Sequence, residues 1–265
     1  MNCRDVSPAN IGGCHVENKD LKSVYDEMHS KGQSSWFSDG QEERELILKM
    51  GEPWEDVRVI EIGCGEGDLS RELWEKKARI FAIDYSPIAI EKAREKHGNL
   101  PFYCEHYRKF GDGDNKVGRL VMQGVLEHLD YPFDELKWMM ENLLTDKGDV
   151  ITSSPCFLNP RGLVWMTLDM LGAVMSKTDL HFIHPWDMRK FCKNEGYKME
   201  WDTCDWSWGD GDKMIEDLRQ RIPLALKDGG IPCDDKKFIT YMEWLDTYNF
   251  PTLYGATAVY KITKS

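Results

Sequence analysis

The sequence predicts an α/β fold built on a doubly wound, mostly parallel β-sheet. Between residues 57 and 155, strand-like and helix-like segments alternate with short connections. Repeated strand–helix units of this kind place neighbouring strands parallel and helices on both faces of the sheet. The chain has 265 residues, of which 41% are hydrophobic. That length and composition suffice for one sizeable domain with insertions.

Each element follows from its local pattern. Ser86 is expected to cap a helix over 86–98 that has Pro87 in its first turn and stops at Gly98. Other helices are expected over 21–30, 38–51 (capped by Ser38 or Asp39), 68–77, 133–148, 186–197, 212–226 and 236–248. Strands are expected in 57–63, 79–86, 100–107, 148–155, 197–204 and 257–264, with one more inside 118–129.

Composition excludes several classes of function. Lys and Arg number 34 and Asp and Glu 46, so the net charge is 34 − 46 = −12, which disfavours binding to nucleic acid. No apolar run approaches the length of a membrane span, and the first twenty residues lack the apolar stretch of a signal peptide. The eight cysteines form no C-x-x-C pair, so reduced thiols in a cytoplasm are expected.

Three glycines follow the first predicted strand at every second position, in the stretch "VRVIEIGCGEGDLS". A strand that ends in Gly63, Gly65 and Gly67 and opens into a helix lets bare backbone approach a ligand. Asp84 ends the second strand, where a carboxylate can accept hydrogen bonds from both ribose hydroxyls. The pattern therefore predicts a site for a nucleoside-bearing cofactor.

The acids around the turn indicate which cofactor. A dinucleotide site needs a third glycine where this chain has Asp68. A carboxylate there would repel a pyrophosphate, which disfavours a nicotinamide oxidoreductase. Glu61, just before the turn, favours an ammonium or another cation nearby. A phosphate-free, positively charged cofactor therefore suits the site better.

Four stretches carry a family resemblance: "VIEIGCGEGDLS", "FAIDYSPIAIEKARE", "VMQGVLEHLDYP" and "LLTDKGDVITSSP". In order and spacing they resemble the successive core motifs of class I S-adenosylmethionine-dependent methyltransferases, in the small-molecule branch of that family. The resemblance implies S-adenosylmethionine as cofactor and a Rossmann-like sheet of about seven strands. It also implies that 257–264 is an antiparallel strand inserted between the fifth and sixth strands.

The resemblance assigns cofactor contacts residue by residue. Asp84 would bind the ribose hydroxyls, Tyr85 the adenine and Glu61 the amino-acid tail. Glu105 stands nearest to the acid that often meets the adenine amino group, although the surrounding pattern departs from the family. The complete expected set is Tyr25, Trp36, Glu61, Gly63, Cys64, Gly65, Gly67, Asp84, Tyr85, Glu105, Gln123, Gly124 and Val125.

Three histidines are candidates for a general base: His128, His181 and His184. Each could instead be structural, the last two as parts of a loop that orients the next helix. Some relatives bind a divalent ion through Glu-x-x-Glu-His at this point. Here Gly124 replaces the first Glu, so no metal is expected.

Three regions are expected: an N-terminal arm and helical lid over 1–50, a cofactor-binding core over 51–155, and a remainder over 156–265. In the lid, Tyr25 and Trp36 would contact the cofactor or else pack in the core. Two insertions, 156–178 and 205–256, would contact the substrate and also contain Arg219 and Arg221. The expected substrate residues are Arg161, Trp165, Trp206 and Trp208.

The acceptor is expected to be a small molecule, methylated on oxygen, with a sugar or similar polar metabolite as first choice. N- or C-methylation of another metabolite, aromatic or quinone-like, is the alternative. A protein that binds S-adenosylmethionine without transferring its methyl group also stays open. The apolar run "LVWMTLDMLGAVM" would pack on itself or on a second subunit, so a homodimer is compatible with the sequence.

Overall fold

The computed structural model describes residues 40–111, 116–156, 158–173, 176, 178–247 and 254–264. Tyr25, Trp36 and the rest of the expected arm and lid up to residue 39 lie outside the described residues. The same holds for the expected helix over 21–30 and for the cap at Ser38 or Asp39.

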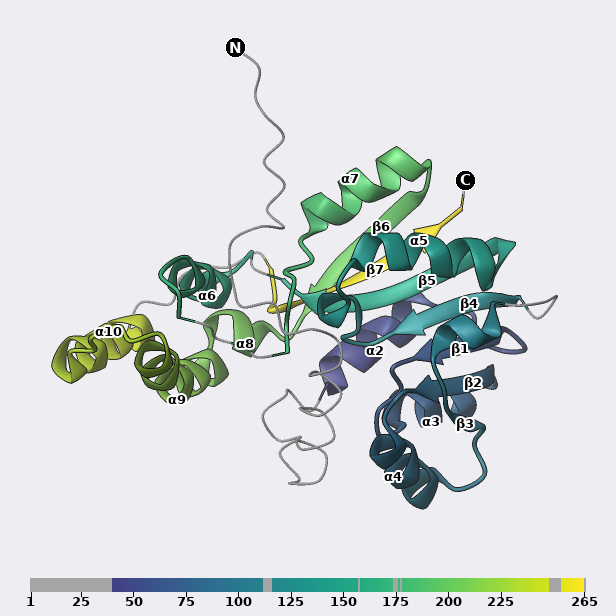
Figure 1. Ribbon diagram of the computed structural model, residues 1–265, viewed down its shortest axis with the longest axis horizontal. Helices are drawn as coiled ribbons and strands as arrows, with labels where there is room; N and C mark the ends of the chain where they lie inside the picture. Colours follow the sequence, from purple (N-terminus) through teal and green to yellow (C-terminus); the bar gives the residue numbers. More distant parts are fainter. Residues whose placement is uncertain are drawn as a thin grey trace, which may run out of the picture.

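The described chain folds around one seven-stranded sheet with strand order β3-β2-β1-β4-β5-β7-β6 (Figure 1). β7 runs antiparallel to both of its neighbours, β5 and β6, whereas the other pairings are parallel. The prediction of an antiparallel strand inserted between the fifth and sixth strands is therefore confirmed. The strands are β1 (Arg58–Ile62), β2 (Arg79–Asp84), β3 (Phe102–Cys104), β4 (Val117–Met122), β5 (Leu144–Pro155), β6 (Lys198–Cys204) and β7 (Thr257–Thr263).

Alternation along the strands builds a hydrophobic core on each face of the sheet. Leu120 and Val150 point to the face covered by α5 (Pro132–Asn142) and α7 (Pro185–Glu195). Val121 and Ile151 point to the opposite face, which α2 (Gln41–Met50) and α3 (Asp68–Glu75) cover. α4 (Pro87–His97) packs beside them on β2 and β3. Period-two patterning of buried residues thus yields the doubly wound arrangement.

Several element ends match their sequence signals and others do not. The Ser86 hydroxyl accepts a hydrogen bond from the Ala89 N–H at the start of α4, as predicted. α2 instead begins after Gly40, which offers no side-chain cap. It packs on β5, β6 and β7, so residues 41–50 belong to the sheet's helical layer and not to a lid. β3 is shorter than expected because His106 accepts the Arg108 N–H and caps a 3-10 turn, η3 (Tyr107–Phe110).

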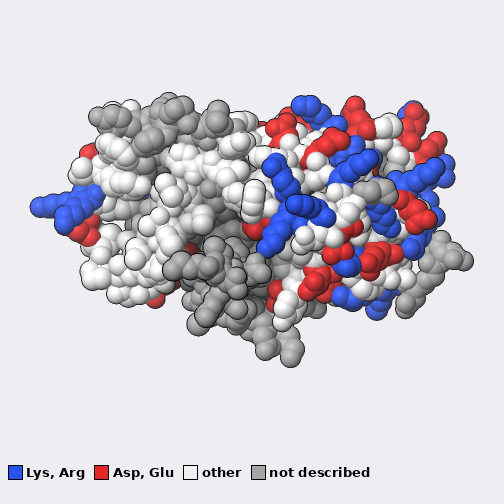
Figure 2. Space-filling model, turned by 90° about the horizontal axis from the view of Figure 1, so that it is seen from above, with Lys and Arg blue, Asp and Glu red and all other residues white. Residues whose placement is uncertain are grey.

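The two insertions come together as one helical cap. We use this name for α6 (Pro160–Met170), α8 (Trp206–Asp210), α9 (Asp212–Asp228) and α10 (Asp235–Thr247). Trp165, Met214, Leu218 and Met242 are buried in its own small core, beside the sheet (Figure 1). On the face shown in Figure 2, charged side chains crowd over the sheet half and are sparse over most of the cap.

Candidate active site

The glycine turn after β1 adopts a backbone that side chains would strain. Gly63, Gly65 and Gly67 have φ values of 72°, 53° and 86°. A Cβ on Gly63 would lie 2.7 Å from Val125, and one on Gly67 would lie 2.6 Å from Phe102. A Cβ on Gly65 would meet nothing within 4 Å. The first and last glycines therefore allow close packing, and the middle one borders open space at the carboxyl edge of the sheet.

Asp84 joins this turn to the end of β2. Its Oδ2 accepts a hydrogen bond of 2.9 Å from the Gly65 N–H, and its Oδ1 accepts one of 2.8 Å from the Ser86 N–H. Tyr85 follows with a side chain that is 40% exposed. A carboxylate and an exposed aromatic ring thus stand together where a ribose and a base would lie.

Glu61 is a buried acid directly beneath the glycine turn. It is 2% exposed and accepts a 2.5 Å hydrogen bond from the Ser70 hydroxyl. Burial, together with the nearby charges of Asp84, Asp68 and Glu72, raises the pKa of its carboxyl to about 8. A cation placed beside Glu61 would relieve this cost.

The turn after β4 lies against the glycine turn. Gly124 has a φ of 60°, and its N–H donates to the Ser153 hydroxyl over 3.1 Å. The Gln123 amide donates to the Glu43 carboxylate over 2.7 Å, so its orientation is set by α2. Among the other expected cofactor residues, Cys64 is buried, and Glu105 donates its N–H to the Asp84 carbonyl while its carboxylate pairs with Lys109.

His128 lies just past this turn, at the end of η4 (Leu126–His128), with partners from a distant loop. Its Nδ1 lies 2.7 Å from the carbonyl oxygen of Thr178 and 3.5 Å from the Asp179 carboxylate. A carbonyl only accepts, so the neutral ring carries its proton on Nδ1 and its lone pair on Nε2. The loop is held in place because the Glu127 carbonyl accepts the N–H groups of Leu180 and His181.

Glu127 is buried under His128 and accepts a 3.0 Å hydrogen bond from the Ser154 hydroxyl. Burial raises the pKa of its carboxyl to about 7, which the neighbouring His128 counteracts. Ligand atoms of Glu127, His128 and Asp179 lie within 4.8 Å of one another. This spacing would also suit a divalent ion. The sequence predicted no metal because Gly124 replaces the first Glu of the motif found in some relatives, and Asp179 was not recognised as a neighbour of Glu127 and His128.

The other two candidate histidines have local structural partners. The His184 Nδ1 accepts the Trp186 N–H and caps α7, and burial lowers the pKa of the His184 ring. The His181 Nε2 lies 3.1 Å from the carbonyl oxygen of Asp130. Of the three, His128 has the geometry that best fits a proton acceptor at the carboxyl edge.

The expected substrate residues gather at the cap. Arg161, in the first turn of α6, donates from Nε and Nη2 to Asp217 of α9 over 3.2 and 3.0 Å. Its guanidinium carbon lies 4.6 Å from the Trp165 ring centroid and 5.2 Å from that of Trp208. Trp165 is only 4% exposed and packs in the core of the cap, whereas Trp206 is exposed on α8.

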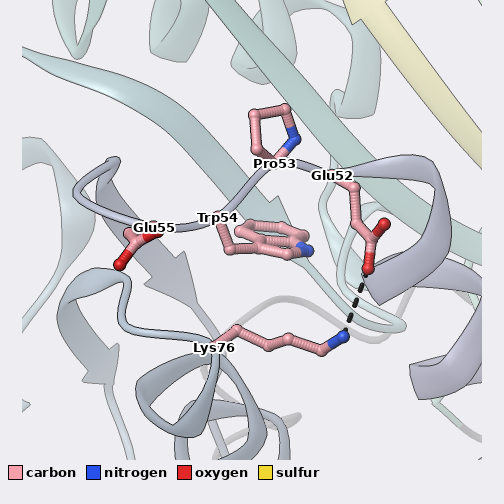
Figure 3. A pocket seen from close by; sticks show the side chains of 5 residues that line it. All are labelled: Glu52, Pro53, Trp54, Glu55 and Lys76. Carbon is pink, nitrogen blue, oxygen red and sulfur yellow. Dashed lines mark hydrogen bonds and ion pairs between the residues drawn. The ribbon is translucent and has the colours of Figure 1, made fainter.

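A pocket at the opposite edge of the sheet has a different character. It is lined by Glu52, Pro53, Trp54, Glu55 and Lys76, with Lys76 paired to Glu52 (Figure 3). These residues precede β1 and β2, so the pocket lies at the amino ends of the strands, away from the glycine turn. Beside it, Arg119 stacks on Trp54 and makes a two-pronged ion pair with Asp149. These contacts of Arg119 stabilise this edge of the sheet.

Comparison with known proteins adds to this geometry. Residues 59–148 match the family model described as "Methyltransferase domain", and this segment runs from β1 into β5 and includes the glycine turn, Asp84 and His128. Residues 59–148 therefore form a methyltransferase domain. The prediction from the four sequence motifs is therefore confirmed, together with S-adenosylmethionine as the cofactor of the family.

Curated relatives match this chain over part of their length. It is 32% identical over 93 residues to the mitochondrial ubiquinone biosynthesis O-methyltransferase of Schizosaccharomyces pombe, covering 34% of that protein. It is 32% identical over 100 residues to a tabtoxin biosynthesis enzyme of Pseudomonas amygdali pv. tabaci, covering 39% of that protein. The chain thus spans about a third of the length of these relatives.

Solved structures share the fold over nearly the whole chain. A methyltransferase from a complex with the Haloferax volcanii Trm112 methyltransferase activator superposes with a TM-score of 0.61 at 17% identity, covering 94% of this chain and 97% of that one. The [4+2]-cyclase SpnF superposes with a TM-score of 0.59 at 13% identity, covering 93% and 96%. Because the second of these is named as a cyclase, the fold alone does not determine the reaction.

Sequence reasoning missed the residues that reach the site from far along the chain. Thr178 and Asp179 contact His128 across fifty positions, and Asp217 pairs with Arg161 across 56. No local pattern marks them, because a lone Asp in a loop or on a helix is normally a surface residue. The paired burial of Arg161 and Asp217 becomes visible only when α6 and α9 are packed together.

Proposed function

We propose that this protein transfers a methyl group from S-adenosylmethionine to a small-molecule acceptor. The observation that carries the proposal is the pairing of an open glycine turn with two carboxylates, Asp84 and buried Glu61, inside the matched methyltransferase segment. Asp84 and Tyr85 would hold the ribose and adenine, and Glu61 the ammonium of the amino-acid tail. When bound, S-adenosylmethionine supplies an activated methyl group whose sulfur departs as a neutral thioether.

The protein's own task is to align the acceptor and exclude water. For a hydroxyl acceptor, His128 would take the proton at Nε2 while its Nδ1–H stays on the Thr178 carbonyl. Asp179, 3.5 Å from Nδ1, would stabilise the imidazolium that forms. This arrangement of base and orienting groups supports oxygen as the methylated atom.

The acceptor of first choice is a sugar or similar polar metabolite, as the arginine and tryptophan side chains of the cap suggest. A nitrogen or carbon acceptor on an aromatic or quinone-like metabolite is the second choice, which the apolar core of the cap favours. None of the described helices has the length and apolar character needed to cross a membrane.

The decisive experiment measures transfer of labelled methyl from S-adenosylmethionine to a panel of sugars, catechols and quinols. His128→Gln should lower turnover of an oxygen acceptor by about a hundredfold while leaving the Kd for S-adenosylhomocysteine within a factor of about two. Asp179→Asn should lower turnover less and shift its pH profile. Full turnover in the His128 variant would remove the base from the proposal.

Chelation separates the base from a metal site. If His128 acts as a base, treatment with EDTA leaves the methylation rate unchanged. Loss of the rate, restored by Mg²⁺ or Mn²⁺, would instead assign Glu127, His128 and Asp179 to a cation. A protein that binds S-adenosylhomocysteine yet methylates no member of the panel would point to a non-catalytic binding role.

A further inference from the structure

The cap contains a cluster of cationic side chains around Arg161. Two guanidinium groups share one carboxylate: Arg161 donates to Asp217 Oδ2, and Arg221 donates to Asp217 Oδ1 over 2.5 Å. The Lys213 ammonium lies 5.9 Å from the Trp208 ring centroid. Asp179 is the second carboxylate whose charge acts on Arg161. The guanidinium groups of Arg161 and Arg221 thus share Asp217 as their nearest carboxylate.

The cluster lies in a poorly hydrated place. The side chains of Arg161, Asp217 and Arg221 are 17%, 7% and 18% exposed. Burial lowers the pKa of the Arg161 guanidinium even though Asp217 and Asp179 act in the opposite direction. A buried cation that its carboxylates compensate incompletely is stabilised by a further anion.

Two donors remain available in this cluster. Arg161 uses Nε and Nη2 on Asp217, and Nη1 bonds to no other residue that the structure describes. The Trp208 indole N–H is fully buried and has no acceptor among those residues. A buried N–H without an acceptor costs free energy that a ligand oxygen would recover. The guanidinium of Arg161 lies over the Trp208 ring, so the two donors are neighbours.

The cluster stands on the acceptor side of the site. α6 follows directly from the carboxyl end of β5, and Arg161 lies in its first turn. Asp179, whose charge reaches Arg161, is also the residue beside His128. An anionic group held at Arg161 would therefore belong to the molecule whose hydroxyl approaches His128.

We propose that the cap recognises a carboxylate on the methyl acceptor, whose oxygens accept from Arg161 Nη1 and the Trp208 indole N–H. This inference rests on the proposed function and narrows its acceptor to an acidic small molecule. The cluster's remaining members, Asp217 and Arg221, hold the Arg161 guanidinium in position.

Calorimetry on protein saturated with S-adenosylhomocysteine tests the subsite with matched probes. The pairs are 3,4-dihydroxybenzoate with 3,4-dihydroxybenzamide, and glucuronate with glucose. In at least one pair the wild-type protein should bind the acid about tenfold or more tightly than its neutral partner. Arg161→Gln should abolish this preference, and Trp208→Phe, which keeps the ring and removes the N–H, should reduce it several-fold. Arg219→Gln, a change at an exposed residue of α9, is the charge-matched control and should leave it intact.

The outcomes are distinguishable. A preference for the acid that disappears in Arg161→Gln or falls in Trp208→Phe supports the subsite, and the second variant decides if the first does not fold. Equal binding of acid and neutral partner within both pairs overturns the subsite, and so does a failure of all four probes to bind. An equal loss of the preference in the Arg219→Gln control also overturns it. If S-adenosylhomocysteine itself does not bind, the proposed function fails. The same pairs measured without it then decide the anion subsite separately.

Discussion

Cofactor binding should expel a proton from the buried carboxyl beneath the glycine turn. Glu61 has a pKa of about 8 in the empty site because burial and neighbouring acids disfavour its charge. At pH 7 a carboxyl with that pKa is about 90% protonated. An ammonium bound beside it favours the carboxylate, so the pKa of Glu61 falls on binding.

The size of the effect follows from the two protonation states. If binding returns the pKa to its ordinary value near 4.5, less than about 1% of the carboxyl stays protonated at pH 7. Glu61 would then release about 0.9 proton per cofactor. The α-amino group of the cofactor, with an ordinary pKa near 8, would take up about 0.1 proton at the same pH. The net release is about 0.8 proton, and the difference between wild type and Glu61→Gln isolates the Glu61 share.

Calorimetric titration of S-adenosylhomocysteine in phosphate, HEPES and Tris buffers at pH 7 measures this number, as the slope of observed enthalpy against buffer ionisation enthalpy. Because the pKa of Glu61 falls on binding, affinity should rise with pH up to about pH 8 and fall above it, where the cofactor's α-amino group loses its proton. Glu61→Gln, which can still accept from Ser70, should bind the cofactor with no Glu61-linked release. An equal number of protons in the two proteins would refute the placement of the ammonium beside this acid.

Three further substitutions are predicted to separate binding from stability. Gly65→Ala should destabilise the fold by only about 1 kcal/mol yet weaken cofactor binding, whereas Gly67→Ala should cost about 2–4 kcal/mol because its Cβ also clashes. Denaturant unfolding and calorimetry check both, and normal affinity in Gly65→Ala would show that the cofactor avoids this turn. Asp84→Ala should weaken S-adenosylhomocysteine binding by about 1–3 kcal/mol, and an unchanged Kd would count against its ribose role. Asp149→Ala should lower the unfolding free energy by about 3–5 kcal/mol by stranding buried Arg119, with cofactor affinity unchanged; a stable variant would contradict this.

The strands, the glycine turn, Asp84 and the start of α4 were predictable because their sequence signals are local. Gly63 and Gly67 take the positive φ values that the turn requires, and Ser86 caps α4 as its sequence context indicates. Period-two burial along the strands places both cores correctly. Contacts between neighbouring strand ends follow from parallel topology, so Asp84 falls beside the glycine turn without any further information.

The placement of α2 and of the cap was less predictable because their contacts are with residues far away in the sequence. The start of α2 at Gly40 shows no capping side chain, and its place on the sheet depends on the burial of Leu46 and Ile47 against distant strands. Trp165 carries the same sequence signal as Trp206, yet one is core and the other exposed. Only the packing of α6 on α9 distinguishes them.

The net charge of −12 does not show how charged side chains are distributed over the site. Asp84 and the buried acid Glu61, which becomes a carboxylate when the cofactor binds, lie at the ends of β1 and β2, where a cationic sulfonium compound would bind. Arg161 and Arg221 share the Asp217 carboxylate in the cap, beyond the end of β5. Under the proposal above, Arg161 would hold an acidic acceptor, and the Asp84 carboxylate would disfavour that acceptor in the cofactor site. Opposite charges at the two ends of the site would thereby favour the in-line approach that methyl transfer requires.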